Sequence, residues 1–163
     1  MYADLSPVIA ATAQWLTRAY PASGGALALA LTDAQARQAV TVAARLRYPT
    51  PMDVGLMGVA GPGGSARLDW ITGVDGDGDG AAADAWRTWV DEVVASWAVS
   101  LLADPELVAR AVRALTEGGT PVDYRRLLNP DDGDRRAAAL LRHPDLVAPV
   151  AVLHRAELLA LVA

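Results

Sequence analysis

Apolar residues recur at helical spacing along the first twenty positions of the chain. Trp15 and Leu16 continue a stripe that begins near residue 8, as expected for one face of an amphipathic helix. Ser6 and Pro7 suit the first turn of such a helix, and Pro21 together with the glycines after it ends the pattern. The sequence therefore predicts a first helix over residues 6–20.

The following segment is compatible with two structures. Residues 26–31 alternate Ala and Leu, so their periodicity favours a strand whereas their composition favours a helix. Thr32 and Gln35 then match a capping box, in which the Thr32 hydroxyl accepts from the Gln35 amide. We expect the helix that this box opens to run to about Tyr48, where Pro49 and Pro51 stop it.

The pattern changes at residue 51, because residues 51–80 contain most of the 14 glycines. Residues 54–60 and 66–72 are short and rich in apolar side chains, and a Gly-Pro-Gly-Gly segment separates them. Such runs on either side of a turn segment are typical of a β-hairpin. We predict a small hairpin that packs on the helices or pairs with residues 26–31, since an isolated hairpin is marginal in water.

From residue 81 the chain is expected to be helical almost throughout. Residues 81–103 carry Trp86, Trp89 and Trp97 on one broad apolar stripe, which predicts a central helix. Further helices are expected after Asp104, over residues 120–128, over residues 132–142 and over residues 149–161, each with Pro or Asp at its start.

Together these elements predict a mainly α protein. We expect one bundle-like domain over residues 1–163, with about six helices and the small β-hairpin, and an α+β fold as the alternative. Within it, residues 1–50 would form the first helices, residues 51–80 a Gly-rich hairpin or loop, and residues 81–163 a helical region. A chain that is 53% apolar at this length can bury a substantial core.

Two segments resemble each other at a distance of 39 residues. Residues 101–109 (LLADPELVA) match residues 140–148 (LLRHPDLVA), and each predicts a helix end, a turn started by Pro and a new helix. The spacing is near that of helical-hairpin repeats, but solenoids need about three units or more. The match therefore indicates either a degenerate repeat or two similar helix junctions.

Composition excludes several kinds of chemistry. The chain has no Cys and no Lys, which rules out disulfides, thiolate metal sites, a Walker-type lysine and a Schiff-base lysine. The net charge of −5 without a basic stripe argues against a nucleic-acid partner. We see no signal peptide and no run of about 20 apolar residues, so we expect no membrane contact and a cytoplasmic location.

A short acidic segment is the sharpest metal motif in the sequence. Asp75, Asp77 and Asp79, followed by Gly80, resemble the first half of an EF-hand loop, in which alternating carboxylates hold Ca²⁺. Trp86 stands where the loop requires its bidentate Glu, so the ligand set is incomplete. The alternative is a solvated Gly-Asp turn, and no other cofactor is implied by the sequence.

The basic residues offer one route to ligand binding. His143 and His154 are the only histidines, and Arg125 with Arg126 forms a basic doublet that could clamp an anion. The same residues would equally suit a helix junction and surface ion pairs. No nucleophile, base and orienting group occur in a known catalytic pattern, so an enzyme is not indicated.

The function that these features favour is a non-catalytic one. Trp is enriched at the energetic centres of protein interfaces, so Trp86, Trp89 and Trp97 are candidates for contact with a protein partner or a second copy. We therefore predict a protein–protein interaction or scaffold component of a larger assembly. A small-molecule-binding protein or enzyme with an Arg- and His-lined pocket is the alternative, and a calcium-binding protein is the third.

Overall fold

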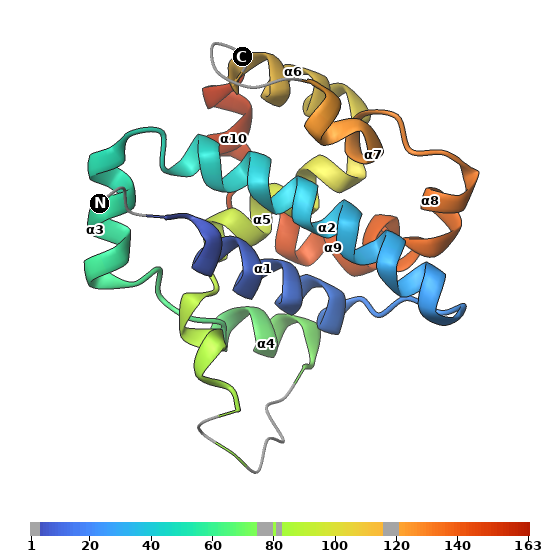
Figure 1. Ribbon diagram of the computed structural model, residues 1–163, viewed down its shortest axis with the longest axis horizontal. Helices are drawn as coiled ribbons and strands as arrows, with labels where there is room; N and C mark the ends of the chain where they lie inside the picture. Colours follow the sequence, from blue (N-terminus) through green and yellow to red (C-terminus); the bar gives the residue numbers. More distant parts are fainter. Residues whose placement is uncertain (1–3, 75–79, 81–82, 116–120) are drawn as a thin grey trace.

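The computed structural model describes residues 4–74, 80, 83–115 and 121–163, and their fold is all-α (Figure 1). This part of the chain forms ten α-helices and three short 3₁₀ helices, with no strand. The α-helices are α1 (Ser6–Ala19), α2 (Gly25–Arg47), α3 (Pro51–Ala60), α4 (Ala66–Thr72), α5 (Glu92–Ala103), α6 (Pro105–Leu115), α7 (Arg125–Leu128), α8 (Asp132–Ala137), α9 (Pro144–Ala151) and α10 (Arg155–Leu161). The 3₁₀ helices are η1 (Ala85–Trp89), η2 (Pro121–Tyr124) and η3 (Leu140–Arg142).

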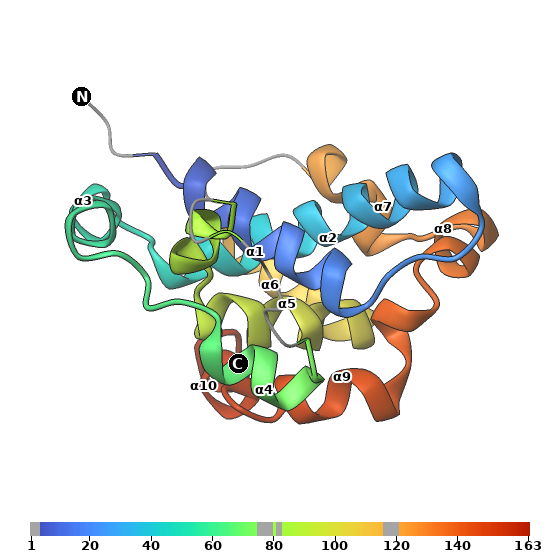
Figure 2. The same cartoon turned by 90° about the horizontal axis from the view of Figure 1, so that it is seen from below.

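Helix α5 is the centre of the core. It lies between a layer formed by α1 and α2 and a layer formed by α9 and α10 (Figure 2). Every residue from Val94 to Leu102 is buried. Ala95, Ser96 and Ala98 are small, so the neighbouring helices can approach α5 closely without leaving voids. The prediction of a mainly α domain is therefore confirmed, and the central helix is Glu92–Ala103 rather than the whole of residues 81–103.

The long helix α2 begins earlier than expected. Residues 26–31 are helical, and Thr32 lies inside the helix rather than at its start. The capping box predicted at Thr32 and Gln35 is therefore wrong. Thr32 Oγ1 donates to the Ala137 carbonyl at 2.9 Å and Gln35 Nε2 donates to the Asp134 carbonyl at 2.9 Å, so both side chains fix α8 against α2.

The predicted β-hairpin is absent from the described residues, because both of its strands are helices. Residues 54–60 belong to α3 and residues 66–72 to α4, with the glycine-containing segment as a linker between them. A capping box does exist here: Thr50 Oγ1 accepts from the Asp53 amide at 3.2 Å, and the Asp53 carboxylate accepts from the Thr50 amide at 3.0 Å. With Pro51 in the first turn, this cap starts a helix where the composition had indicated a strand.

Several other predicted helices are divided in the structure. The described part of residues 81–103 forms η1 and then α5, because Asp91 interrupts the chain and caps α5. Residues 132–142 form α8 and η3, and the predicted last helix is replaced by α9 and α10, which meet near Leu153. Together with α3 and α4, which replace the predicted hairpin, the division of the last helix accounts for the larger number of α-helices among the described residues.

The two similar segments lie in the same part of the fold. Pro105 begins α6 and Pro144 begins α9, and α5 packs against both η3 and α9. The helix before each proline differs, however, since α5 has 12 residues and η3 has three. The local junctions are alike, whereas the helical hairpins that a repeat would require are not.

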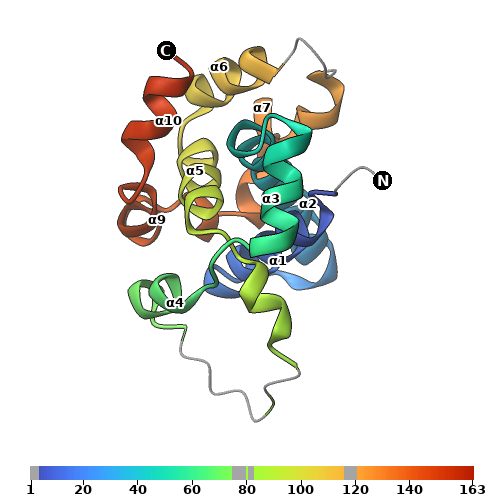
Figure 3. The same cartoon turned by 90° about the vertical axis from the view of Figure 1, so that its left-hand side faces the viewer.

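Helix α3 lies at one edge of the molecule, in the foreground of Figure 3 and away from the stacked layers in Figure 2. Only Val54 and Met57 of its side chains are buried. Within the described ranges, no helix has both the length and the apolar character needed to cross a membrane.

Candidate functional site

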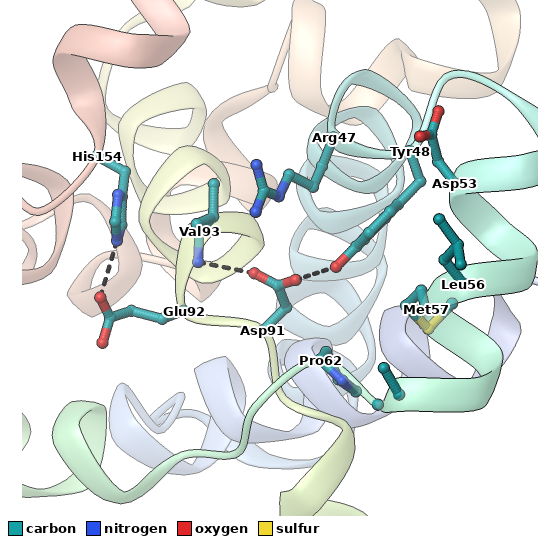
Figure 4. Close-up of a pocket in the computed structure, with 12 residues that line it drawn as sticks. Arg47, Tyr48, Asp53, Leu56, Met57, Pro62, Asp91, Glu92, Val93 and His154 are labelled. Atoms are coloured by element: carbon teal, nitrogen blue, oxygen red, sulfur yellow. Dashed lines mark hydrogen bonds and ion pairs between the residues drawn. The ribbon is translucent and has the colours of Figure 1, made fainter.

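A cleft of about 550 Å³ separates α3 from the first turn of α5 (Figure 4). We call it the α3–α5 cleft. Leu56 and Met57 of α3 form its apolar wall, and Arg47 extends from the end of α2 toward the start of α5. The opposite wall is polar and contains the three side chains Asp91, Glu92 and His154.

Asp91 is the buried polar residue of this wall. Its Oδ1 atom accepts from the Val93 amide at 2.8 Å and from the Val94 amide at 3.0 Å, which caps α5. Its Oδ2 atom accepts a short hydrogen bond from the Tyr48 hydroxyl. Burial, together with this bond to a carboxylate, raises the pKa of Tyr48 above its usual value. Both oxygens of Asp91 are therefore occupied in holding α2 and α5 together.

His154 is placed between two carboxylates. Its Nε2 atom lies 2.8 Å from Glu92 Oε1, and its Nδ1 atom lies 3.4 Å from Glu157 Oε1. Glu92 also accepts from Arg67 Nη1 at 3.3 Å, which links the histidine to α4. The imidazole is thus engaged on both nitrogens, and it contributes to packing of α4, α5 and α10.

The backbone around His154 is fixed by α5. Ser96 Oγ donates to the Ala151 carbonyl at 3.0 Å and accepts from the His154 amide at 3.0 Å. Trp97 Nε1 donates to the His154 carbonyl at 2.9 Å. Two adjacent side chains of α5 therefore hold the turn between α9 and α10.

The outward side of α3 carries a row of exposed apolar side chains. Met52, Leu56 and Val59 are 75%, 64% and 91% exposed, and their spacing places them on one side of the helix. We call these three residues and Gly55, which lies one turn from Met52 and Val59, the α3 outer face. A Cβ atom added at Gly55 would meet no other atom within 4 Å. Sequence analysis missed this face because the segment was interpreted as a strand.

The tryptophans predicted as interface residues are mostly part of the core. Trp97 is buried, and Trp86 and Trp89 are half-buried against core side chains. The Arg18 guanidinium lies 4.9 Å from the centre of the Trp86 ring. The exposed tryptophan is Trp70 of α4, which the sequence analysis did not single out.

The residues predicted to bind an anionic ligand do not converge on one place. Arg126 pairs with the buried carboxylate of Asp134 at 2.7 Å, and Arg125 is exposed on the same short helix. His143 is exposed at the start of α9 and its side chain makes no cap. Only His154 lines the α3–α5 cleft, where Arg47 is the arginine that accompanies it.

The predicted calcium ligands Asp75, Asp77 and Asp79 lie outside the described residues. Among the residues that are described, no group of three His, Asp or Glu side chains is arranged to hold a metal ion.

Comparison with protein-family models, with curated proteins and with solved structures gave no match for this chain. The charged side chains of the α3–α5 cleft are one arginine and three carboxylates, those of Asp53, Asp91 and Glu92. This balance disfavours an anionic ligand there. Asp91, Glu92 and His154 are also already engaged by other side chains. By contrast, Met52, Leu56 and Val59 are largely exposed, and of these three only Leu56 also borders the cleft.

Proposed function

We propose that this protein acts by protein–protein association, that the α3 outer face is the contact, and that a second copy of the chain is its occupant. The observation that carries the proposal is the row formed by Met52, Leu56 and Val59, which are large, apolar and exposed on one helix. Contiguous apolar patches of more than a few hundred Å² are uncommon on proteins that work as monomers, and such patches mark interaction sites.

Hydrophobic burial supplies the driving force. Fully burying one large aliphatic side chain stabilises by roughly 1.5–3 kcal/mol. Two copies that meet through their α3 outer faces would each contribute three such side chains, a gross gain of about 9–18 kcal/mol if all six are fully buried. The association itself costs about 4–15 kcal/mol, so the difference corresponds to a reversible dimer rather than a permanent one. The few contacts of α3 with the rest of the chain leave this face accessible.

The glycines of α3 support close approach of another helix. Gly55 and Gly58 destabilise a helix by about 1 kcal/mol each relative to alanine. Added Cβ atoms would meet nothing within 4 Å at either position, so the chain's own packing does not require glycine there. A helix that packs against the outer face from another molecule would use the space left at Gly55 to receive a large side chain.

A second copy fits this face better than a charged partner does. The only charged residue of α3 is Asp53, whose carboxylate is engaged by Thr50 in the capping box. Two α3 helices related by a two-fold axis would therefore pair without like charges between them, although the chain carries a net charge of −5. Large side chains and a glycine on the same face also make it self-complementary, as a two-fold contact requires.

The decisive test is the molar mass in solution over a wide concentration range, measured by sedimentation equilibrium. The unaltered protein should form a dimer, and Leu56→Asp should remain a monomer because a buried carboxylate is strongly unfavourable. The matched control is Leu27→Asp, since Leu27 is 73% exposed and lies in the first turn of α2, at the end of that long helix away from α3. It should dimerise like the unaltered protein. A monomer at every concentration, or equal dissociation constants for the two variants, would refute the proposal.

A further inference from the structure

The α3 outer face borders a hollow at the C-terminal end of its helix. This hollow has a volume of about 430 Å³ and lies between the last turn of α3, the linker to α4 and the end of η1. Its lining residues include four glycines, one aliphatic residue and one tryptophan: Gly58, Gly61, Gly63, Gly64, Val59 and Trp89. We call it the glycine hollow. None of the described residues that line it is charged, so it favours an uncharged occupant.

The α3 outer face is different at its two ends. Val59 belongs to this face and also lines the glycine hollow, so the two surfaces are continuous. Met52, which is 75% exposed, lies at the other end of the face, seven positions earlier in the chain. Seven residues of α-helix span roughly 10 Å. The face therefore has a long, flexible side chain at its N-terminal end and an open hollow at its C-terminal end.

This difference favours one orientation of two copies. In a two-fold contact, each residue meets on the other copy the residue that meets it in return. Antiparallel α3 helices place Met52 of each copy beside Val59 and the glycine hollow of the other. Parallel helices would place the two Met52 side chains together and leave both hollows empty. The helix dipoles also favour the antiparallel arrangement, because the positive N-terminus of each helix then lies near the negative C-terminus of the other.

We propose that two copies of the chain pair through antiparallel α3 helices, and that Met52 of each copy occupies the glycine hollow of the other. This inference rests on the association proposed above, to which it adds the orientation and the side chain that each copy contributes. Methionine suits such a hollow because it is unbranched and adapts to irregular space, and its sulfur makes favourable contacts with aromatic rings. Trp89 supplies a ring in the wall of the hollow.

Disulfide cross-linking tests the orientation, because the chain contains no cysteine of its own. A disulfide requires the two Cα atoms to lie within about 7 Å of each other. In the antiparallel pair, a mixture of Met52→Cys chains and Val59→Cys chains should form mixed disulfide dimers at least tenfold faster than either variant cross-links with itself. Mass spectrometry distinguishes the mixed dimer because the two variants differ in mass. Leu27→Cys on α2 is the control and should not cross-link faster than random collision allows.

The occupancy of the hollow is tested by two further variants. Met52→Ala should weaken dimerisation by about 100-fold, because the dimer contains two such contacts and each is expected to contribute about tenfold. Gly58→Leu places a side chain in the hollow and should weaken dimerisation by about tenfold or more. If Met52 occupies the hollow, the two substitutions affect the same contact. The double variant should then dimerise far better than the product of the two single effects predicts.

Sedimentation equilibrium of the unaltered protein separates this inference from the proposed function. A dimer with rapid mixed cross-linking and coupled variants supports both. A dimer in which Met52→Cys chains cross-link with themselves at least as fast as in the mixture, or in which the two variants act independently, overturns the inference and leaves the proposed function standing. A monomer at every concentration overturns both.

Discussion

Helices α3 and α5 each carry one acidic residue near the start and are otherwise uncharged, yet they occupy opposite environments. Nine residues of α5 are buried and only two of α3 are. Helix α5 has α2 on one side and α9 on the other, whereas α3 is held at the edge between Pro49 and the linker that precedes α4. Apolar character alone therefore does not determine burial, and an apolar helix outside the core is available for a contact with another molecule.

A Leu→Ala substitution in each of the two helices should give the largest difference in the free energy of unfolding. Leu101→Ala in α5 should lower the free energy of unfolding by about 2–5 kcal/mol, because it leaves a cavity in a fully packed region. Leu56→Ala in α3 should change it by less than about 0.5 kcal/mol, because the side chain is already exposed. Urea denaturation at low protein concentration measures both values, and equal losses would contradict the assigned environments.

Removal of the helix cap should likewise cost more stability in α5 than in α3. Asp91→Ala removes the cap of α5 and leaves the Tyr48 hydroxyl without its acceptor, so we expect a loss of about 2–3 kcal/mol. Thr50→Ala at the cap of α3 should cost about 1 kcal/mol at most. Amide hydrogen exchange should show faster exchange across the core for the first variant and within α3 alone for the second. Asp91→Asn keeps one acceptor for the cap and should lie between the unaltered protein and Asp91→Ala.

High pH should destabilise the core of the protein but not the edge helix α3. Burial raises the pKa of Tyr20 to about 12, above the value near 10 expected for the unfolded chain. The folded state therefore holds this proton longer, so its stabilising effect is complete below about pH 10 and is lost as the pH rises to about 12. The loss due to Tyr20 should be on the order of 2 kcal/mol.

Tyr20→Phe is the control for this titration. It removes the hydrogen bond from the Tyr20 hydroxyl to the Leu146 carbonyl, which lowers stability at every pH, but it also removes the titrating group. The free energies of unfolding measured below and above the pH range of the Tyr20 titration should then differ less for Tyr20→Phe than for the unaltered protein. Parallel losses in the two proteins would show that Tyr20 does not cause the alkaline effect.

The smallest expected effect separates the intrinsic stability of helix α3 from its part in dimerisation. Gly55→Gln should raise the stability of the monomer by about 0.5 kcal/mol, because glutamine is the better helix former and meets open space. The same side chain on the α3 outer face should weaken dimerisation, which sedimentation equilibrium would detect. If the variant is more stable and dimerises equally well, Gly55 is not part of the dimer contact.

Sequence patterns predicted helices better than they predicted where each helix begins. The first helix and the start of α6 at Pro105 follow from local residue types, and both are confirmed. At Thr32 the local pattern was misleading, because the hydroxyl and the Gln35 amide bond to α8, about 100 residues away in the chain. Partners at that distance are not visible in a local pattern.

The site was harder to predict than the fold, again for a physical reason. The spacing of Met52, Leu56 and Val59 is present in the sequence, but interpreting residues 54–60 as a strand hid it. The capping box formed by Thr50 and Asp53 could have corrected that interpretation. Nothing in the sequence indicates that Asp91 would bond to Tyr48, since that contact joins residues 43 positions apart.

The hydrogen bonds from Ser96 and Trp97 to the turn before α10 affect how the chain can fold while it is being synthesised. These bonds join residues 55–58 positions apart, so a nascent chain must grow well beyond α5 before that side of the helix is covered. Until then the central helix presents apolar surface to the ribosome exit and to chaperones. Productive folding should therefore be a late step of translation, and stalled chains that end before residue 151 should be the ones most prone to aggregate.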